Sequence, residues 1–139
     1  MIKELVKDTD FLAKPLAPAT ADDAQIAQDL RDTMASLDSC ACLAANQIGY
    51  DKAVIAYEAG AKGVAVMFNP QVKQAMIPYL ATESCLSLSY DSEVKRFKRI
   101  IVAYEELVDG KLVARQKKFS DWTAEIILHA VDHCNGLLV

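Results

Sequence analysis

The sequence predicts an α+β protein, and three observations lead to that prediction. Apolar residues recur at helical spacing before residue 40, short β-rich runs broken by turn residues fill positions 40–119, and an almost wholly apolar helical segment follows. Hydrophobic residues make up 53% of the 139 positions and charged residues 24%, a composition typical of a chain with a buried core. We expect residues 1–139 to form a single domain.

The first helix is predicted to begin near Thr20 and Asp23, whose three-residue spacing is that of a capping box. The apolar positions that follow recur every three or four residues, and they are Ile26, Ala27, Leu30, Met34 and Leu37. This spacing places them on one face, so we expect an amphipathic N-terminal helix.

Four runs in the middle of the chain have the composition of strands, namely 53–57, 63–68, 99–106 and 111–119. The Asp109-Gly110 pair between the last two favours a tight turn, which predicts a hairpin. The basic run 95–99 alternates with apolar residues, and we interpret its charges as one solvated face of a strand.

The last helix is predicted between Ser120, which stands at an N-cap position, and Asn135-Gly136, which ends it. This segment is apolar nearly all round, and such a helix is buried. Its predicted inner side contains Trp122, Ile126, His129, Ala130 and His133. The two histidines are the only ones in the chain, and they lie one helical turn apart.

Composition excludes several functional classes. The net charge of −4 and the lack of a basic stripe argue against a nucleic-acid partner. The first fifteen residues show no signal sequence, and apolar runs such as 64–68 are too short to span a bilayer, so we expect no membrane partner. Four cysteines without a signal peptide indicate reduced thiols, and we expect a cytoplasmic protein.

Two histidines four residues apart are the arrangement by which metal hydrolases present two imidazoles to one ion. The usual His-Glu-x-x-His pattern has a Glu where this chain has Ala130, so core histidines remain an alternative interpretation. A catalytic metal site usually has a third protein ligand. Cys85, in a turn-like stretch, is a candidate thiolate, although a lone cysteine is often a small core residue.

Three segments resemble, in order and spacing, the three signature motifs of the peptide deformylase family. They are CACLAANQIG (40–49), ESCLS (83–87) and HAVDH (129–133). The family motifs are Gly-x-Gly-apolar-Ala-Ala-x-Gln, Glu-Gly-Cys-Leu-Ser and His-Glu-x-x-His. The resemblance extends to DTDFLAKP, VKRFKRIIVAYEELVDGK and HCNGLLV, and so covers essentially the whole chain. It implies short mixed or antiparallel β-sheets around a central, metal-binding C-terminal helix.

The resemblance implies that Cys85, His129 and His133 hold one divalent ion, Fe(II) by family habit, with Zn, Ni or Co also compatible. The implied activity is metal-assisted hydrolysis of the N-formyl group from the N-terminal Met of new polypeptides. Gln47 and the backbone N–H of Leu86 are expected to stabilise the oxyanion. Glu83 is expected to orient a ligating imidazole, and Asp132 to make a structural contact near the ligands.

The departures from the family motifs fall where chemistry is decided. Cys40 and Cys42 replace two glycines of the cleft, beside Leu43, and we expect their side chains to narrow it. Ser84, Leu128 and Asp121 replace a third Gly, a Gln and a fourth Gly.

The resemblance implies a general-base Glu at the position of Ala130, and the loss of such a base costs about 10²–10⁴ in rate. Glu125 and Asp132 do not occupy the position of that base, so we expect neither to replace it. The scattered departures favour a natural, degenerate family member over an engineered knockout.

Two other functions remain open from the sequence. One is a non-catalytic binder of peptide N-termini, and the other is a structural zinc protein built on Cys40, Cys42, Cys85 or Cys134. Because the sequence ends at Val139, we expect no ribosome docking through a C-terminal extension.

Overall fold

A computed structural model describes all residues 1–139 and confirms the α+β class. In chain order the elements are α1 (Thr9–Leu12), η1 (Ala21–Asp23), α2 (Ala24–Ser36), β1 (Cys42–Ala44), η2 (Ala45–Ile48), β2 (Val54–Glu58), η3 (Gly60–Lys62), β3 (Val64–Glu83), β4 (Ser92–Val108), β5 (Lys111–Ser120) and α3 (Asp121–Cys134). None of the helices combines the length and hydrophobicity that crossing a membrane requires.

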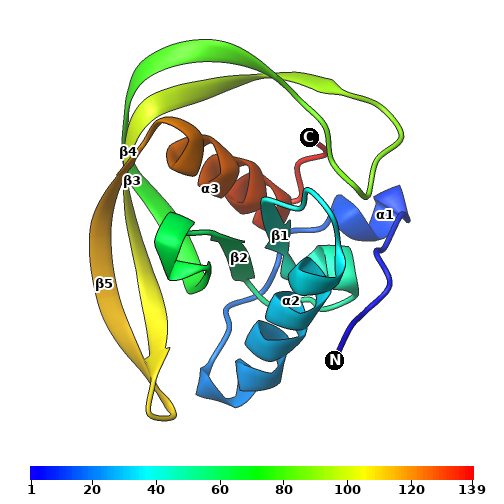
Figure 1. Cartoon of the computed structure of the whole chain (residues 1–139), viewed down its shortest axis with the longest axis vertical. Coiled ribbons are helices and arrows are strands. Elements are labelled where there is room, and N and C mark those ends of the chain that lie inside the picture. The colour runs from blue at the N-terminus through cyan, green and yellow to red at the C-terminus, as the bar shows by residue number, and fades with distance from the viewer.

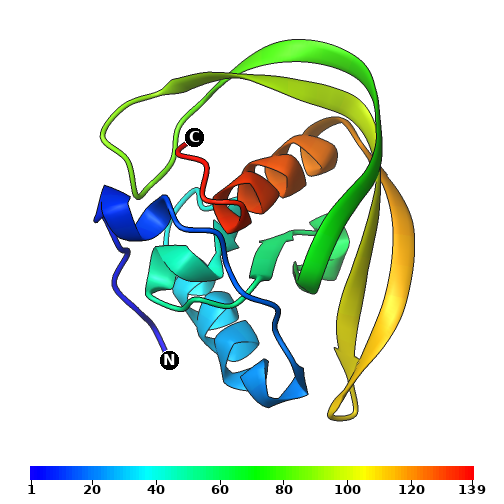
Figure 2. The ribbon, with the colours of Figure 1, turned by 180° about the vertical axis from the view of Figure 1, so that it is seen from behind.

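All five strands form one antiparallel sheet in the order β1-β2-β3-β4-β5. β3 and β4 are much longer than the sequence predicted, and together they arch over α3 (Figures 1 and 2). The pairing of β3 with β4 shifts register after Phe68 and again after Val72. Such irregularities bend a strand, so the two shifts account for the curvature that wraps the sheet around the last helix.

The sequence did not predict the part of β3 after residue 68, here called its outer half, because this part does not have the pattern of a buried strand. β2 pairs with residues 64–68 only, so beyond them β3 is an edge strand bonded to β4 alone. Pro70 lies at the register shift and Pro78 on this edge, the two settings in which a sheet tolerates proline. Most side chains between Gln74 and Pro78 are exposed, so no apolar alternation marks this half.

α3 is buried as predicted, between the arch and the short strands. Its apolar side chains pack with Ile55, Met67, Ile100 and Val102 of the sheet. Trp122 departs from the prediction, because its side chain is 58% exposed in the first turn of the helix. Asp121 has a left-handed φ of 54° at the sharp turn from β5 into the helix, a conformation that Asp tolerates better than most residues.

α2 packs its predicted apolar face against β1 and β2 in a second apolar cluster. The predicted cap is present, although the first turn is 3-10: the Thr20 N–H donates to Asp23 Oδ2 over 2.8 Å. On the same helix, buried Asp29 accepts hydrogen bonds from the Met1 ammonium, the Tyr50 hydroxyl and the Gln25 amide. Burial opposes ionisation of Asp29, but these donors outweigh it and lower the pKa to about 2.

The end of α3 is fixed against the segment that follows α1. The Leu16 N–H donates to the Cys134 carbonyl over 2.8 Å. Gly136 has a φ of 78°, and a Cβ there would lie 2.5 Å from the Ala13 carbonyl oxygen. Only glycine therefore fits, and the close approach holds the last turn of the helix, which contains His133, in place.

Candidate metal centre and cleft

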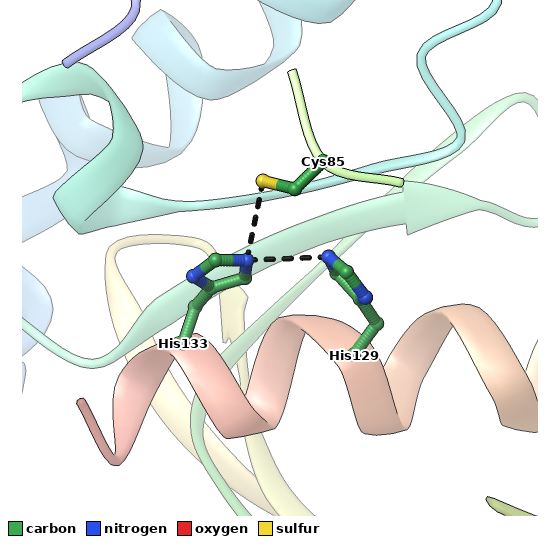
Figure 3. Close-up of side chains that lie close together, drawn as sticks. All are labelled: Cys85, His129 and His133. Atoms are coloured by element: carbon green, nitrogen blue, oxygen red, sulfur yellow. Dashed lines mark hydrogen bonds between the residues drawn. The ribbon is translucent and has the colours of Figure 1, made fainter. Parts of the chain in front are cut away.

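Three side chains that are distant in sequence converge beneath the arch. Cys85 follows the end of β3, whereas His129 and His133 lie one turn apart on α3 (Figure 3). The Cys85 Sγ lies 3.4 Å from the His133 Nε2, which in turn lies 3.2 Å from the His129 Nε2. All three residues are buried, and their donor atoms lie within 4.8 Å of one another.

These separations match the ligand shell of one tetrahedral ion. Bond lengths of about 2.3 Å to sulfur and 2.05 Å to nitrogen place two nitrogen ligands about 3.3 Å apart and a sulfur about 3.6 Å from a nitrogen. The observed nitrogen–nitrogen and sulfur–nitrogen distances are 3.2 and 3.4 Å. The one-sulfur, two-nitrogen set therefore fits a divalent transition metal with a position left for another ligand.

Glu83 orients the His129 imidazole through the ring nitrogen that points away from the centre. The His129 Nδ1 lies 2.7 Å from the Glu83 Oε1, and because an ionised carboxylate only accepts, Nδ1 carries the hydrogen. Nε2 is then the ring atom that faces Cys85 and His133 (Figure 3). Glu83 itself is fixed by Arg96, whose Nε and second terminal nitrogen donate to its two oxygens over 2.8 and 2.7 Å.

Arg96 corrects the interpretation of the basic run. Lys95, Lys98 and Arg99 are exposed as predicted, but Arg96 is buried and its third contact is Asp132 on α3, at 2.6 Å. The alternation of a strand points Arg96 inward, where two carboxylates compensate its charge. Asp132, which was expected to make a structural contact near the ligands, is thus ion-paired with Arg96.

The charges around the centre favour a positive charge between its donor atoms. Burial opposes ionisation of Cys85, but hydrogen bonds with His129 and His133 lower its pKa to about 6. Burial likewise opposes protonation of His129, but Cys85 and Glu83 raise its pKa to about 9. Burial would raise the pKa of Glu83, yet His129 and Arg96 lower it to about 2. The Cys85 thiolate and the Glu83 carboxylate are negative, and either a proton on His129 or a metal ion at the centre compensates their charge.

Gln47 joins the centre from η2. Its Nε2 lies 3.2 Å from the Cys85 Sγ and 3.3 Å from the Ser87 hydroxyl, while its Oε1 accepts from the Ala44 N–H over 2.9 Å. This last bond fixes which end of the amide faces the sulfur. The sequence predicted no role for Ser87, although it ends the ESCLS motif, nor for Asn46, whose amide donates to the His133 carbonyl over 2.9 Å.

A cavity of about 330 Å³ opens beside the centre. Its walls include Cys85, His129, Gln47, Leu86, Cys40 and Cys42. The two cysteines that replace glycines have ordinary φ angles, so their backbone conformation does not require glycine. Leu43 was predicted to line the cleft, but it is fully buried in the cluster under α2, because alternate side chains of β1 face opposite sides.

The carboxylates near the centre have different surroundings. Asp132 is paired with Arg96 and does not line the cavity. Glu125 does line it, and accepts a hydrogen bond from the Tyr79 hydroxyl over 2.8 Å. Ala130 is fully buried in the apolar cluster of α3 and contributes no proton-transferring group.

The remaining thiols do not form a second metal site. The Cys85 group is the only set of three or more metal-ligating side chains in the structure. Burial raises the pKa of Cys40 to about 11 and that of Cys134 to about 12, so neither is a thiolate near neutral pH. The geometry therefore does not support the structural zinc protein that the sequence left open.

The chain is similar to known proteins both in sequence and in fold. The sequence model described as polypeptide deformylase matches residues 3–139. A peptide deformylase from Clostridium beijerinckii is 37% identical over 140 residues, which cover the whole of both chains. The solved peptide deformylase from Thermotoga maritima superposes with a TM-score of 0.87 at 25% identity, covering 99% of this chain and 95% of that one. A class I type b peptide deformylase from Acinetobacter baumannii, solved with Met-Ala-Ser bound, gives 0.85 at 25% identity, covering 99% and 97%.

Proposed function

The chain belongs to the polypeptide deformylase family, and from that premise we propose that it is a metal-dependent hydrolase of N-formyl peptide termini whose catalysis is strongly impaired. N-formyl-methionyl peptides are the proposed substrate and Fe(II) the proposed ion, with Zn, Ni and Co also suited to one sulfur and two nitrogens. The Met-Ala-Ser bound to the Acinetobacter baumannii relative supports a peptide terminus as the ligand.

One contrast carries the proposal: the donor atoms of the centre remain compact, while the residue after the first histidine is Ala130. Glu83 and Asp132 do not replace the missing base, because both carboxylates are ion-paired with Arg96. Loss of a positioned acid–base group costs about 10²–10⁴ in rate. We therefore infer slow turnover at a preserved binding site.

The remaining groups have roles that follow from their positions. When bound, the divalent ion supplies Lewis acidity that polarises a carbonyl and activates water. The Gln47 amide and the Leu86 N–H, at the cavity wall, donate to the oxygen that becomes negative during hydrolysis. Glu83 keeps the His129 ring turned so that its Nε2 faces the centre.

Formate release from formyl-Met-Ala-Ser by the Fe- or Ni-loaded protein tests the proposal. We expect kcat/KM at least about 10²-fold below that of a family member that has Glu after the first histidine, because the base is absent. The Cys85→Ser variant, which lacks the sulfur ligand, is the control and should release none. A rate within about tenfold of the intact relative would contradict impairment.

A non-catalytic binder of peptide N-termini is the second candidate. The cavity and the donors Gln47 and Leu86 favour it, since they bind a peptide whether or not it is cleaved. Tight binding of formyl-Met-Ala-Ser without any formate after prolonged incubation with excess enzyme would favour the binder over the slow hydrolase.

A further inference from the structure

A second cavity, of about 720 Å³ against the 330 Å³ of the first, lies away from the metal centre and shares no residue with the first cavity. It is bordered by α2, η3 and strands β2 to β5. Its volume falls in the range of about 300–1,000 Å³ that is typical of ligand sites. Its walls are largely apolar and include Val64, Val66, Phe68, Leu107 and Phe119. The proposed hydrolysis uses none of these residues.

Two buried tyrosine hydroxyls in this cavity have no partner in the protein. Tyr57 and Tyr104 line the cavity and are only 6% and 7% exposed. The Tyr79 hydroxyl donates to a carboxylate, whereas those of Tyr57 and Tyr104 bond to no protein group. The unpartnered side-chain atoms that are sealed in the core are Asn46 Oδ1 and His133 Nδ1, so both tyrosine hydroxyls reach the cavity space. Buried polar groups are normally hydrogen-bonded, which indicates that a polar atom of a ligand belongs beside them.

Tyr57 presents a donor to such a ligand. Burial raises the pKa of Tyr57 to about 12, and the neighbouring Tyr104 and Glu106 add to the rise. The phenol therefore remains protonated at neutral pH, and a phenol O–H donates a hydrogen bond. The preferred ligand atom is an acceptor, and an anionic oxygen is the strongest acceptor available.

The charged residues of the cavity also favour an anion. Its lining contains three cations, Arg31, Lys62 and Lys117, and one carboxylate, Glu106, which is ion-paired with Arg115. Lys62 and Lys117 take part in none of the ion pairs of the structure. The chain as a whole has a net charge of −4, so this excess of positive charge is local to the cavity.

The strand register places one of the cations beside the hydroxyls. Lys117 of β5 pairs with Val102 of β4, and alternate residues of a strand share a face, so Lys117, Phe119 and Tyr104 lie on the same face of the sheet. Lys117 is the diagonal neighbour of Tyr104, at a distance that long side chains bridge. The Phe119 ring in turn meets the Tyr57 ring edge-on, with the centroids 6.0 Å apart. One ammonium and two hydroxyls thus surround the same part of the cavity.

We propose that this cavity binds a small amphipathic anion, a carboxylate with an unbranched apolar chain. The carboxylate accepts hydrogen bonds from Tyr57 and Tyr104 and is compensated by Lys117, while the chain packs on the apolar walls around Phe68 and Leu107. A small molecule fits better than a protein surface, because only a narrow group reaches hydroxyls that are more than nine-tenths buried. The site does not depend on the proposed hydrolysis, since the two cavities share no residue.

Calorimetric titration of the Zn-loaded protein with three ten-carbon probes tests the proposal. Decanoate, the uncharged decanol and the cationic decyltrimethylammonium are each used below the concentration at which they form micelles. We expect one decanoate per chain, bound at least about tenfold more tightly than decanol, the ratio that one hydrogen bond to a charged group provides. Decyltrimethylammonium should bind no more tightly than decanol.

Variants locate the bound anion. Lys117→Met and Tyr104→Phe should each weaken decanoate binding about fivefold or more and leave decanol unchanged. Lys118→Met is the matched control, because Lys118 is the next residue of β5, pairs with Ile101 and lies on the opposite face of the sheet. Cys85→Ser, which removes the sulfur of the metal centre, should bind decanoate as the wild type does. Circular dichroism establishes that the variants are folded.

The outcomes that overturn the proposal are distinct. Decanol bound as tightly as decanoate would mean that the cavity has no anion site. Equal weakening by Lys118→Met and Lys117→Met would mean that decanoate responds to the overall charge alone. Loss of decanoate binding in folded Cys85→Ser would place the carboxylate on the metal, and no heat with any probe would leave the cavity without a ligand of this class.

Discussion

The buried arginine of β4 gives the prediction whose magnitude follows most directly from the structure. Arg96 is 4% exposed and makes two hydrogen bonds to Glu83, which is 7% exposed, and one to Asp132. Arg96→Met keeps the apolar stem but leaves the buried Glu83 carboxylate without its guanidinium. Removing one member of a buried pair costs about 3–5 kcal/mol, so we predict that loss in the free energy of unfolding.

Urea denaturation at neutral pH measures the loss, and Arg115→Met is the matched control. Arg115 donates to Glu106 over 2.9 Å, but both side chains are more than 40% exposed, so its removal should cost less than about 1 kcal/mol. We also expect the Zn affinity of Arg96→Met to fall about 10–100-fold, because Glu83, once released by Arg96, no longer fixes the orientation of the His129 ring. Equal stabilities of the two variants would refute the role assigned to the Arg96 network.

Three further predictions concern other parts of the molecule. The protein should bind about one divalent ion by elemental analysis; Cys85→Ser should lose it, whereas Cys134→Ser, a buried thiol outside the centre, should keep it. Gly136→Ala should cost about 1–3 kcal/mol more in urea denaturation than Gly60→Ala, since both have positive φ but only the first new Cβ meets backbone. Asp29 should contribute about 2 kcal/mol to the free energy of unfolding, because its pKa is lowered from 3.8 to about 2 on folding. This contribution is present above pH 4 and is lost as the pH falls to 2. Asp29→Asn should therefore flatten that part of the stability–pH profile.

Each of these has an outcome that contradicts it. Metal retained by Cys85→Ser would remove the sulfur from the ligand set. Equal destabilisation by the two glycine substitutions would mean that the helix end yields to the added carbon. An unchanged acid profile in Asp29→Asn would mean that its hydrogen bonds do not stabilise the ionised form.

The sequence predicted the elements whose pattern is local. Helical spacing located α2 and α3, and Asp109-Gly110 located the turn between β4 and β5. The arch was missed because half of β3 is an edge strand with prolines and exposed side chains, and that half has no periodic apolar face. Its existence depends on pairing with β4, which is a long-range property.

The residues of the site also separate into those with a signal in the local sequence and those that only the fold brings together. The spacing of His129 and His133 is a local signal, and the family resemblance supplied Cys85, which lies 44 positions before the nearer histidine. The Tyr79–Glu125 pair spans 46 positions, and each partner alone resembles a surface residue. Only the bend of β3 over α3 brings them together.

We propose that an otherwise preserved centre lacks one carboxylate, and Ala130→Glu tests this claim most directly. Formate release from formyl-Met-Ala-Ser is measured for the Ni-loaded wild type, Ala130→Glu and Ala130→Gln. The last variant is the control, because it adds the same volume without a base. Since Ala130 is buried in an apolar cluster, metal content and circular dichroism must establish that both variants are folded. We predict a gain of at least about 10² for Glu and none for Gln; a folded, metal-loaded Ala130→Glu that is no faster than the wild type would contradict the claim.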